Sequence, residues 1–140
     1  MPMTRRDMMA LATGSIAAYG LNAVPARASA TDEAIAAFTG GLDPADGGLV
    51  LDVPEIAENG NAVPVSVSAD GAVAILVVST ENPLPGVATF RFGPLAASSS
   101  GSTRIRLARS QDVIAVAKME DGTFRRTSAS VKVTVGGCGA

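Results

Sequence analysis

The sequence VPVSVSADGAVAILVV, residues 63–78, decides the fold. In its first six residues valine alternates with proline or serine, which is typical of a strand with one buried and one wet face. The run Ala72–Val78 is then apolar without a break, as in a central strand that is covered on both sides. Two such strands in close succession favour an all-β protein.

Strand patterns continue on both sides of this stretch, and Asp121-Gly122 is a hairpin turn signal because glycine readily adopts positive φ. About seven short strands predict an all-β fold, an immunoglobulin-like β-sandwich over residues 49–135. A small closed barrel is the alternative. Residues 94–102 are expected to form a polar loop. The further strands are expected at Leu49–Val53, Thr89–Phe92, Thr103–Arg109, Asp112–Met119 and Ser128–Val135.

A short helix and a loop are expected before the sandwich, over residues 31–48. Thr31 or Asp32 can cap a helix that runs to Thr39, and Gly40-Gly41 ends it. Ile35 and Phe38, three residues apart, lie on one face of this helix.

Residues 1–30 have the plan of a cleaved signal peptide. Arg5-Arg6 precedes the uncharged apolar run Met8–Leu21, which is shorter than the ~20 residues that span a bilayer. The paired arginines favour the twin-arginine route to a bacterial periplasm, which accepts folded cargo. Two small-x-small triplets, Ala26-Arg27-Ala28 and Ala28-Ser29-Ala30, allow cleavage after Ala28 or after Ala30. We expect no membrane attachment in the mature form.

The composition excludes most kinds of catalytic chemistry. The chain has no histidine and one cysteine, so it cannot form a His/Cys metal cluster, a Cys-His or Ser-His-Asp unit, or an internal disulfide. An enzyme could still use carboxylates or a lysine, but without the commonest general base. We predict no catalytic residue, no metal ligand and no cofactor. The net charge of −2 gives no electrostatic footprint for nucleic acid.

The one residue with distinctive chemistry is Cys138, in the C-terminal tail Gly136-Gly137-Cys138-Gly139-Ala140. Because glycine permits almost any backbone direction, residues 136–140 are expected to form a flexible arm that reaches roughly 10 Å beyond the sandwich. No base lies near the thiol along the chain, and the C-terminal carboxylate disfavours the thiolate. The tail fits a thiol that is presented to other proteins.

Two uses of this thiol stay open from tail composition. The first is a carrier that holds a covalent cargo. The second is an interaction module whose single cysteine forms an intermolecular disulfide. A thiol enzyme or redox sensor is disfavoured, because the chain lacks histidine and a second cysteine.

Several stretches of the chain, read with the export signal, form a family pattern. The most specific one is the ending Val131–Gly139. The supporting stretches are Pro54–Gly60, Val63–Val65, Asn82-Pro83, Val87–Phe90, Thr103–Ala108, Val116-Ala117 and Asp121-Gly122. With these residues the chain resembles the SoxY family, the sulfur-carrying subunit of the bacterial Sox thiosulfate-oxidation system. The tail departs from the family pattern at Ala140, where a second glycine is usual.

The resemblance implies a non-catalytic carrier in which Cys138 binds pathway intermediates as covalent adducts, on an arm formed by Gly136, Gly137 and Gly139. It also implies a heterodimer with SoxZ. The c-type haem enzyme SoxAX would join thiosulfate to the cysteine, and the metal-dependent hydrolase SoxB would release sulfate. In many organisms the sulfane dehydrogenase SoxCD would oxidise the remaining sulfur.

Overall fold

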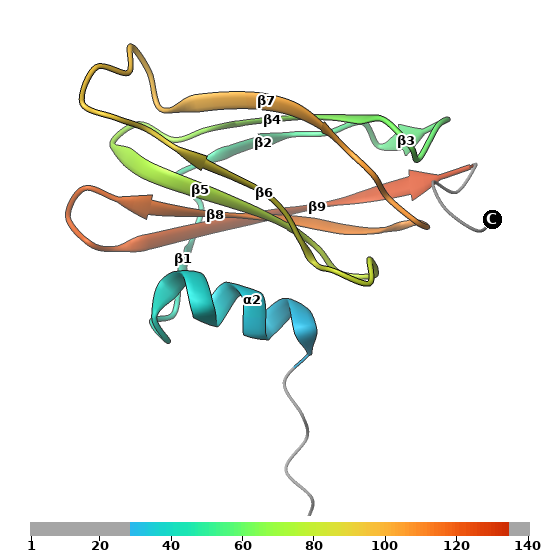
Figure 1. Ribbon diagram of the computed structural model, residues 1–140, viewed down its shortest axis with the longest axis horizontal. Helices are drawn as coiled ribbons and strands as arrows, with labels where there is room; N and C mark the ends of the chain where they lie inside the picture. Colours follow the sequence, from blue (N-terminus) through green and yellow to red (C-terminus); the bar gives the residue numbers. More distant parts are fainter. Residues whose placement is uncertain (1–28, 135–140) are drawn as a thin grey trace, which may run out of the picture.

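The computed structural model describes residues 29–134, which form two packed sheets with one helix (Figure 1). The glycine tail and all but the last two residues of the expected signal lie outside this range. The elements are α2 (Ala30–Thr39), β1 (Ala45–Asp46), β2 (Val50–Asp52), β3 (Ile56–Ala57), β4 (Val63–Ser68), β5 (Ala72–Ser79), β6 (Gly86–Arg91), β7 (Ser100–Ile105), β8 (Gln111–Met119) and β9 (Phe124–Val133).

The larger sheet has the strand order β1-β9-β8-β5-β6, and β3 also pairs with β9. The smaller sheet has the order β2-β4-β7 and lies above the larger one in Figure 1. The two sheets do not close into a barrel. The prediction of an all-β sandwich is confirmed, and the barrel alternative is wrong.

Strand β5 is buried on both of its faces, as its unbroken apolar sequence predicted. Ile75 and Val77 contribute to the core between the two sheets. Leu76 and Val78 point the other way, into a second core under α2. In Figure 1 the helix lies below the larger sheet, on the side away from the smaller one. The helix therefore covers a sheet face that would otherwise expose apolar side chains to water.

Helix α2 contributes one apolar stripe to this second core. Ile35 is buried, and Phe38 packs edge-on against Phe124 of β9, with ring centroids 5.9 Å apart and an interplanar angle of 72°. An aromatic pair in this geometry contributes about 0.5–1.5 kcal/mol beyond the burial of its area. The prediction that Ile35 and Phe38 share a face is confirmed, since both pack in this core.

The start of α2 differs from the prediction. The helix begins at Ala30, and its N-cap is Ser29, whose hydroxyl accepts a hydrogen bond from the backbone N–H of Asp32. Thr31 cannot serve as the cap because it lies within the first turn and is buried. The end of the helix is as predicted, with Gly40 in the left-handed conformation (φ 67°).

The hairpin between β8 and β9 confirms the turn predicted at Asp121-Gly122. Gly122 has a positive φ of 84°. The Asp121 carboxylate accepts hydrogen bonds from the backbone N–H of Thr123 (2.9 Å) and from its hydroxyl (2.6 Å). These bonds, chiefly the one from the hydroxyl, lower the pKa of Asp121 below its usual value.

Several strand boundaries differ from the predictions. Strand β7 begins at Ser100, inside the expected loop, because Ser100, Gly101 and Ser102 pair with β4. It ends at Ile105 and not at Arg109, and β9 begins four residues earlier than expected. Strands β1 and β3 were not predicted. Each has two residues and pairs in parallel with β9.

Gly101 lets β7 approach the side chain of Phe90, which packs against the core between the sheets. A Cβ atom at Gly101 would overlap Cδ1 of the Phe90 ring, well inside van der Waals contact. Close packing of a glycine against an aromatic ring holds this edge of the small sheet against β6.

We predict that Gly101→Ala lowers the free energy of unfolding by about 1–3 kcal/mol, because the added methyl group overpacks this contact. Urea denaturation of the mature domain measures the change. Gly93→Ala is the matched control, since a Cβ there meets nothing within 4 Å. Equal stability of the two variants would contradict the packing described for Gly101.

Candidate functional site

The residues predicted to form the carrier arm, Gly136, Gly137, Cys138 and Gly139, lie outside the described residues. The structure describes the chain as far as Thr134, one residue past the end of β9. What it shows of the site is therefore the base from which the tail departs.

On one side, the end of β9 is held by β3 and its neighbours. The backbone N–H of Lys132 donates to the carbonyl of Glu55 (2.8 Å), and that of Thr134 donates to the carbonyl of Ala57 (3.0 Å). The hydroxyl of Thr134 reaches the carbonyls of Ala57 (3.4 Å) and Glu58 (3.5 Å). This side of the strand is thus paired up to the last described residue.

On the other side of β9, the side chain of a serine forms hydrogen bonds with the strand beyond the point where its pairing with β8 ends. The last pair of that ladder is Gln111 with Val131. Beyond it, the Ser110 hydroxyl accepts a hydrogen bond from the backbone N–H of Val133 (2.8 Å) and donates to its carbonyl (3.4 Å). Val131 is buried in the core between the sheets. The end of β9 is therefore held by hydrogen bonds on both sides and by the burial of Val131 in the core.

Ser110 belongs to a loop that a network of amides joins to the loop after β5. The Asn82 side chain accepts from the backbone N–H of Ala108 (3.1 Å) and from the amide of Gln111 (2.9 Å). It also donates to the carbonyl of Arg106 (2.7 Å). The Gln111 side chain accepts from the backbone N–H of Glu81 (2.9 Å). The loop that carries Ser110 is therefore held in place by the hydrogen bonds of Asn82 and Gln111.

A shallow pocket of about 280 Å³ lies between these two loops, one residue away from Ser110 along the chain. It presents an acid, two arginines and an amide, but this set holds no nucleophile paired with a base. Most of the exposed lining is apolar, and the polar groups among these residues do not form a catalytic pair. The lining residues are Glu81, Asn82, Pro83, Arg106, Ala108 and Arg109.

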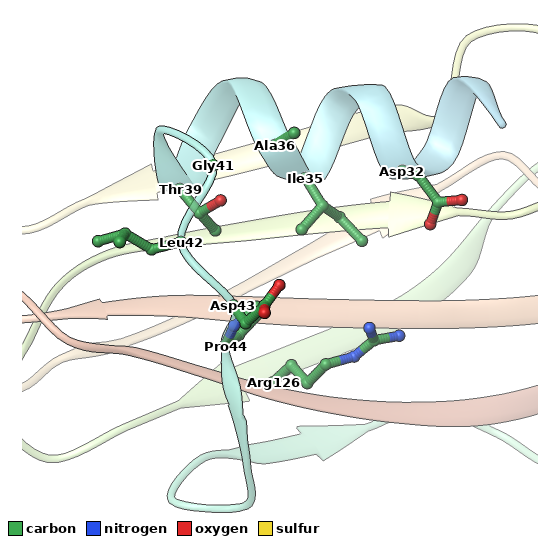
Figure 2. Close-up of a pocket in the computed structure, with 9 residues that line it drawn as sticks. All are labelled: Asp32, Ile35, Ala36, Thr39, Gly41, Leu42, Asp43, Pro44 and Arg126. Atoms are coloured by element: carbon green, nitrogen blue, oxygen red, sulfur yellow. The ribbon is translucent and has the colours of Figure 1, made fainter. Parts of the chain in front are cut away.

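A second pocket, of about 190 Å³, lies between α2 and β9 (Figure 2). Asp32 and Ile35 extend from the helix, and Arg126 of β9 lies beside Asp43. Arg126 is eight residues from Thr134, or roughly 26 Å along an extended strand. Cys138, four residues past Thr134, can be no more than about 14 Å from it. A fully extended chain from Thr134 to Cys138 is therefore shorter than the separation of Thr134 from Arg126.

Across residues 29–134 there is no group of three or more Asp, Glu, His or Cys residues that could hold a metal ion. Within the same range, no helix has the length and apolar character needed to span a membrane.

The sequence did not predict the contacts that hold the end of β9. Ser110 stands in an ordinary polar loop, and its role depends on Val133, which is 23 residues away. Strand β3 is too short for any periodic pattern. The stretch Pro54–Gly60 contains β3, but it was quoted only for the family resemblance and carried no prediction of a contact with β9.

Comparison with known proteins gives a family and a fold. Residues 35–138 match the model of the family described as sulfur oxidation protein SoxY. The structure of the sulfur carrier protein SoxY from Chlorobium limicola f. thiosulfatophilum is 36% identical, with a TM-score of 0.65, and the match covers 74% of this chain and 96% of that chain. Among curated proteins none matches.

Other solved structures share the fold at low identity. Superoxide reductase (neelaredoxin) from Ignicoccus hospitalis is 15% identical, with a TM-score of 0.55, over 62% of this chain and 80% of that one. A putative superoxide reductase from Thermotoga maritima is 16% identical, with a TM-score of 0.52, over 70% and 91%. These likenesses show the sandwich alone. The family match over residues 35–138 and the similarity to the Chlorobium protein together show that this chain belongs to the SoxY family.

Proposed function

We propose that this protein is a periplasmic carrier that binds the sulfur intermediates of thiosulfate oxidation covalently on Cys138 and presents them to partner enzymes. SoxY proteins are sulfur carriers and non-catalytic subunits of the Sox system. The observation that supports the assignment to Cys138 most directly is that the family match extends to this residue, the only cysteine of the chain.

The proposed loading step is an oxidation. The Cys138 thiolate and thiosulfate form a sulfur–sulfur bond, which gives a cysteine S-thiosulfonate and releases two electrons to the haem of SoxAX. A thiol must first lose its proton. Because a free cysteine has a pKa of ~8.5 and the chain has no histidine, the partner enzyme would supply the activation.

The unloading steps are hydrolytic. Water attacks the terminal sulfonate in the site of SoxB, which releases sulfate and two protons and leaves a persulfide on Cys138. SoxCD would accept six electrons from the outer sulfur of the persulfide, while three waters supply the oxygens of a new terminal sulfonate and six protons are released. A second hydrolysis then releases sulfate and a proton and regenerates the thiol. In this proposal the chain, in a heterodimer with SoxZ, binds the sulfur intermediates and presents them to the enzymes. Each covalent bond is made or broken in the active site of a partner enzyme.

The geometry of β9 suits this division of work. Hydrogen bonds from Ser110 and from β3 fix the strand up to Thr134. A thiol at most about 14 Å from a fixed point samples a small volume, so its effective concentration at a docked enzyme is high. The glycines on both sides of Cys138 keep the tail slim enough for a narrow cleft.

Export is part of the proposal, and it rests on the sequence of the signal. The pair Arg5-Arg6 and the short apolar run favour the twin-arginine route. An oxidising compartment would also permit the alternative use of Cys138, a disulfide between two chains. Intact-mass measurement after incubation with thiosulfate distinguishes a carrier of covalent sulfur from a disulfide-linked dimer.

We predict that the purified protein, incubated with thiosulfate and an oxidising c-type haem partner, gains the mass of one thiosulfate adduct in intact-mass measurement. Mild reduction removes the adduct, and Cys138→Ser does not form it. A protein that appears only as a stable disulfide-linked dimer, without an adduct, would rule out the carrier function.

We predict that proline at Gly136 and Gly137 slows turnover by roughly tenfold or more, since a restricted tail places the sulfur poorly in partner sites. Thiosulfate-dependent electron transfer in the reconstituted system measures this rate. The thermal unfolding midpoint should stay that of the unmodified protein. Full turnover in the double-proline variant would show that tail freedom is not required.

We predict that Ser110→Ala raises the hydrogen-exchange rate of the Val133 amide by about fivefold, which corresponds to the ~1 kcal/mol of one hydrogen bond. Ser128→Ala is the control, because Ser128 is an exposed residue of the same strand whose hydroxyl has no hydrogen-bond partner among the described residues. Equal exchange rates of the Val133 amide in both variants would refute the role given to Ser110.

A further inference from the structure

The first described residues fix the start of the folded domain more sharply than the sequence does. The Ser29 hydroxyl accepts a hydrogen bond from the backbone N–H of Asp32 (3.1 Å) and donates to the Asp32 carboxylate (2.8 Å). The Ser29 carbonyl accepts from the backbone N–H of Glu33 (3.0 Å). The Ser29 hydroxyl thus satisfies the Asp32 N–H, which has no partner within the helix, and the Ser29 carbonyl accepts the first i→i−4 bond of the helix.

The residues at this point differ in exposure. Ser29 and Ala30 are exposed, and Ser29 has an extended backbone (φ −62°, ψ 157°). Thr31 is only 7% exposed, although it lies in the first turn of the helix. The side chain of Thr31 is therefore packed against the domain, whereas those of Ser29 and Ala30 are not.

We propose that signal peptidase cleaves the bond between Ala28 and Ser29, and not the bond between Ala30 and Thr31, so that Ser29 is the first residue of the exported protein. This inference rests on the proposed export of the chain. Both bonds follow a small-x-small triplet, so the sequence motif does not separate them. The structure does.

Access of the protease to the chain favours the bond after Ala28. A protease binds its substrate in an extended conformation, and cargo of the twin-arginine route is folded before its signal is removed. Cleavage after Ala30 would require the first turn of α2 to open and Thr31 to leave its packed position. Cleavage after Ala28 places the extended residue Ser29 just past the cut, and the helix stays intact.

The stability of the mature helix also favours the bond after Ala28. Cleavage after Ala30 removes both acceptors of Ser29 and leaves a new ammonium group on Thr31, in the first turn. A positive charge there opposes the helix dipole. Cleavage after Ala28 keeps the cap and places the ammonium group on Ser29, near the acidic side chains of Asp32 and Glu33 in the first turn. Because α2 covers the second core, its cap matters to the whole domain.

The test is N-terminal sequencing of the exported protein, produced from the full chain in a bacterium with a twin-arginine system. The inference expects Ser29-Ala30-Thr31 as the first residues. A chain that begins at Thr31 would overturn the inference and leave the proposed export standing. An uncleaved chain in the cytoplasm would overturn both, and its intact signal distinguishes this result from the previous one.

Two matched variants separate the triplets, because Ala28 belongs to both but Ala26 and Ala30 each belong to one. Ala26→Phe should slow the appearance of the mature protein by roughly tenfold or more, since a bulky residue enters the triplet that is used. Ala30→Phe changes an exposed residue and should leave the rate and the Ser29 terminus unchanged. The opposite pattern, slow processing of Ala30→Phe with normal processing of Ala26→Phe, would overturn the inference.

Discussion

The hydrogen-bonded pair of β5 and β8 is the constraint on which the rest of the structure depends, because both strands are buried on both faces. The pair runs from Ala72 opposite Met119 to Ser79 opposite Val113. One face of the pair packs on the smaller sheet and the other on α2. Strand β9 follows β8 through a tight hairpin and pairs with it along most of its length. The end of β9, where the tail begins, is therefore positioned by the best-buried part of the molecule.

Much of this architecture was predictable from the sequence, and the reason is periodicity. The bounds of β4 were predicted correctly, and the double burial of β5 followed from a run of seven apolar residues. Strands β1 and β3 were missed because two residues contain no period. The cap of α2 was misplaced because Ser29, Thr31 and Asp32 all have a suitable oxygen, and only the folded helix shows that the Ser29 hydroxyl accepts the Asp32 N–H while Thr31 is buried.

The candidate site also has one part that the sequence predicted and one part that it did not. Cys138 was identified from composition, since it is the one cysteine in a chain without histidine and stands among glycines. The supports of the tail could not be found in this way. Ser110 and Asn82 act through backbone groups of Val133 and Ala108, and contacts between residues more than twenty positions apart leave no local pattern. Family membership links the two parts, because the match extends from α2 to Cys138.

The central claim is that a fixed sandwich presents one thiol that bears covalent sulfur. Trypsin digestion of protein loaded with thiosulfate and an oxidising haem partner tests it most directly. Cleavage after Lys132, an exposed residue, releases residues 133–140 with the only cysteine. The account predicts that mass spectrometry finds this peptide as a single chain with a thiosulfate adduct that mild reduction removes. Recovery of the peptide unmodified, or as a disulfide-linked pair, would contradict it.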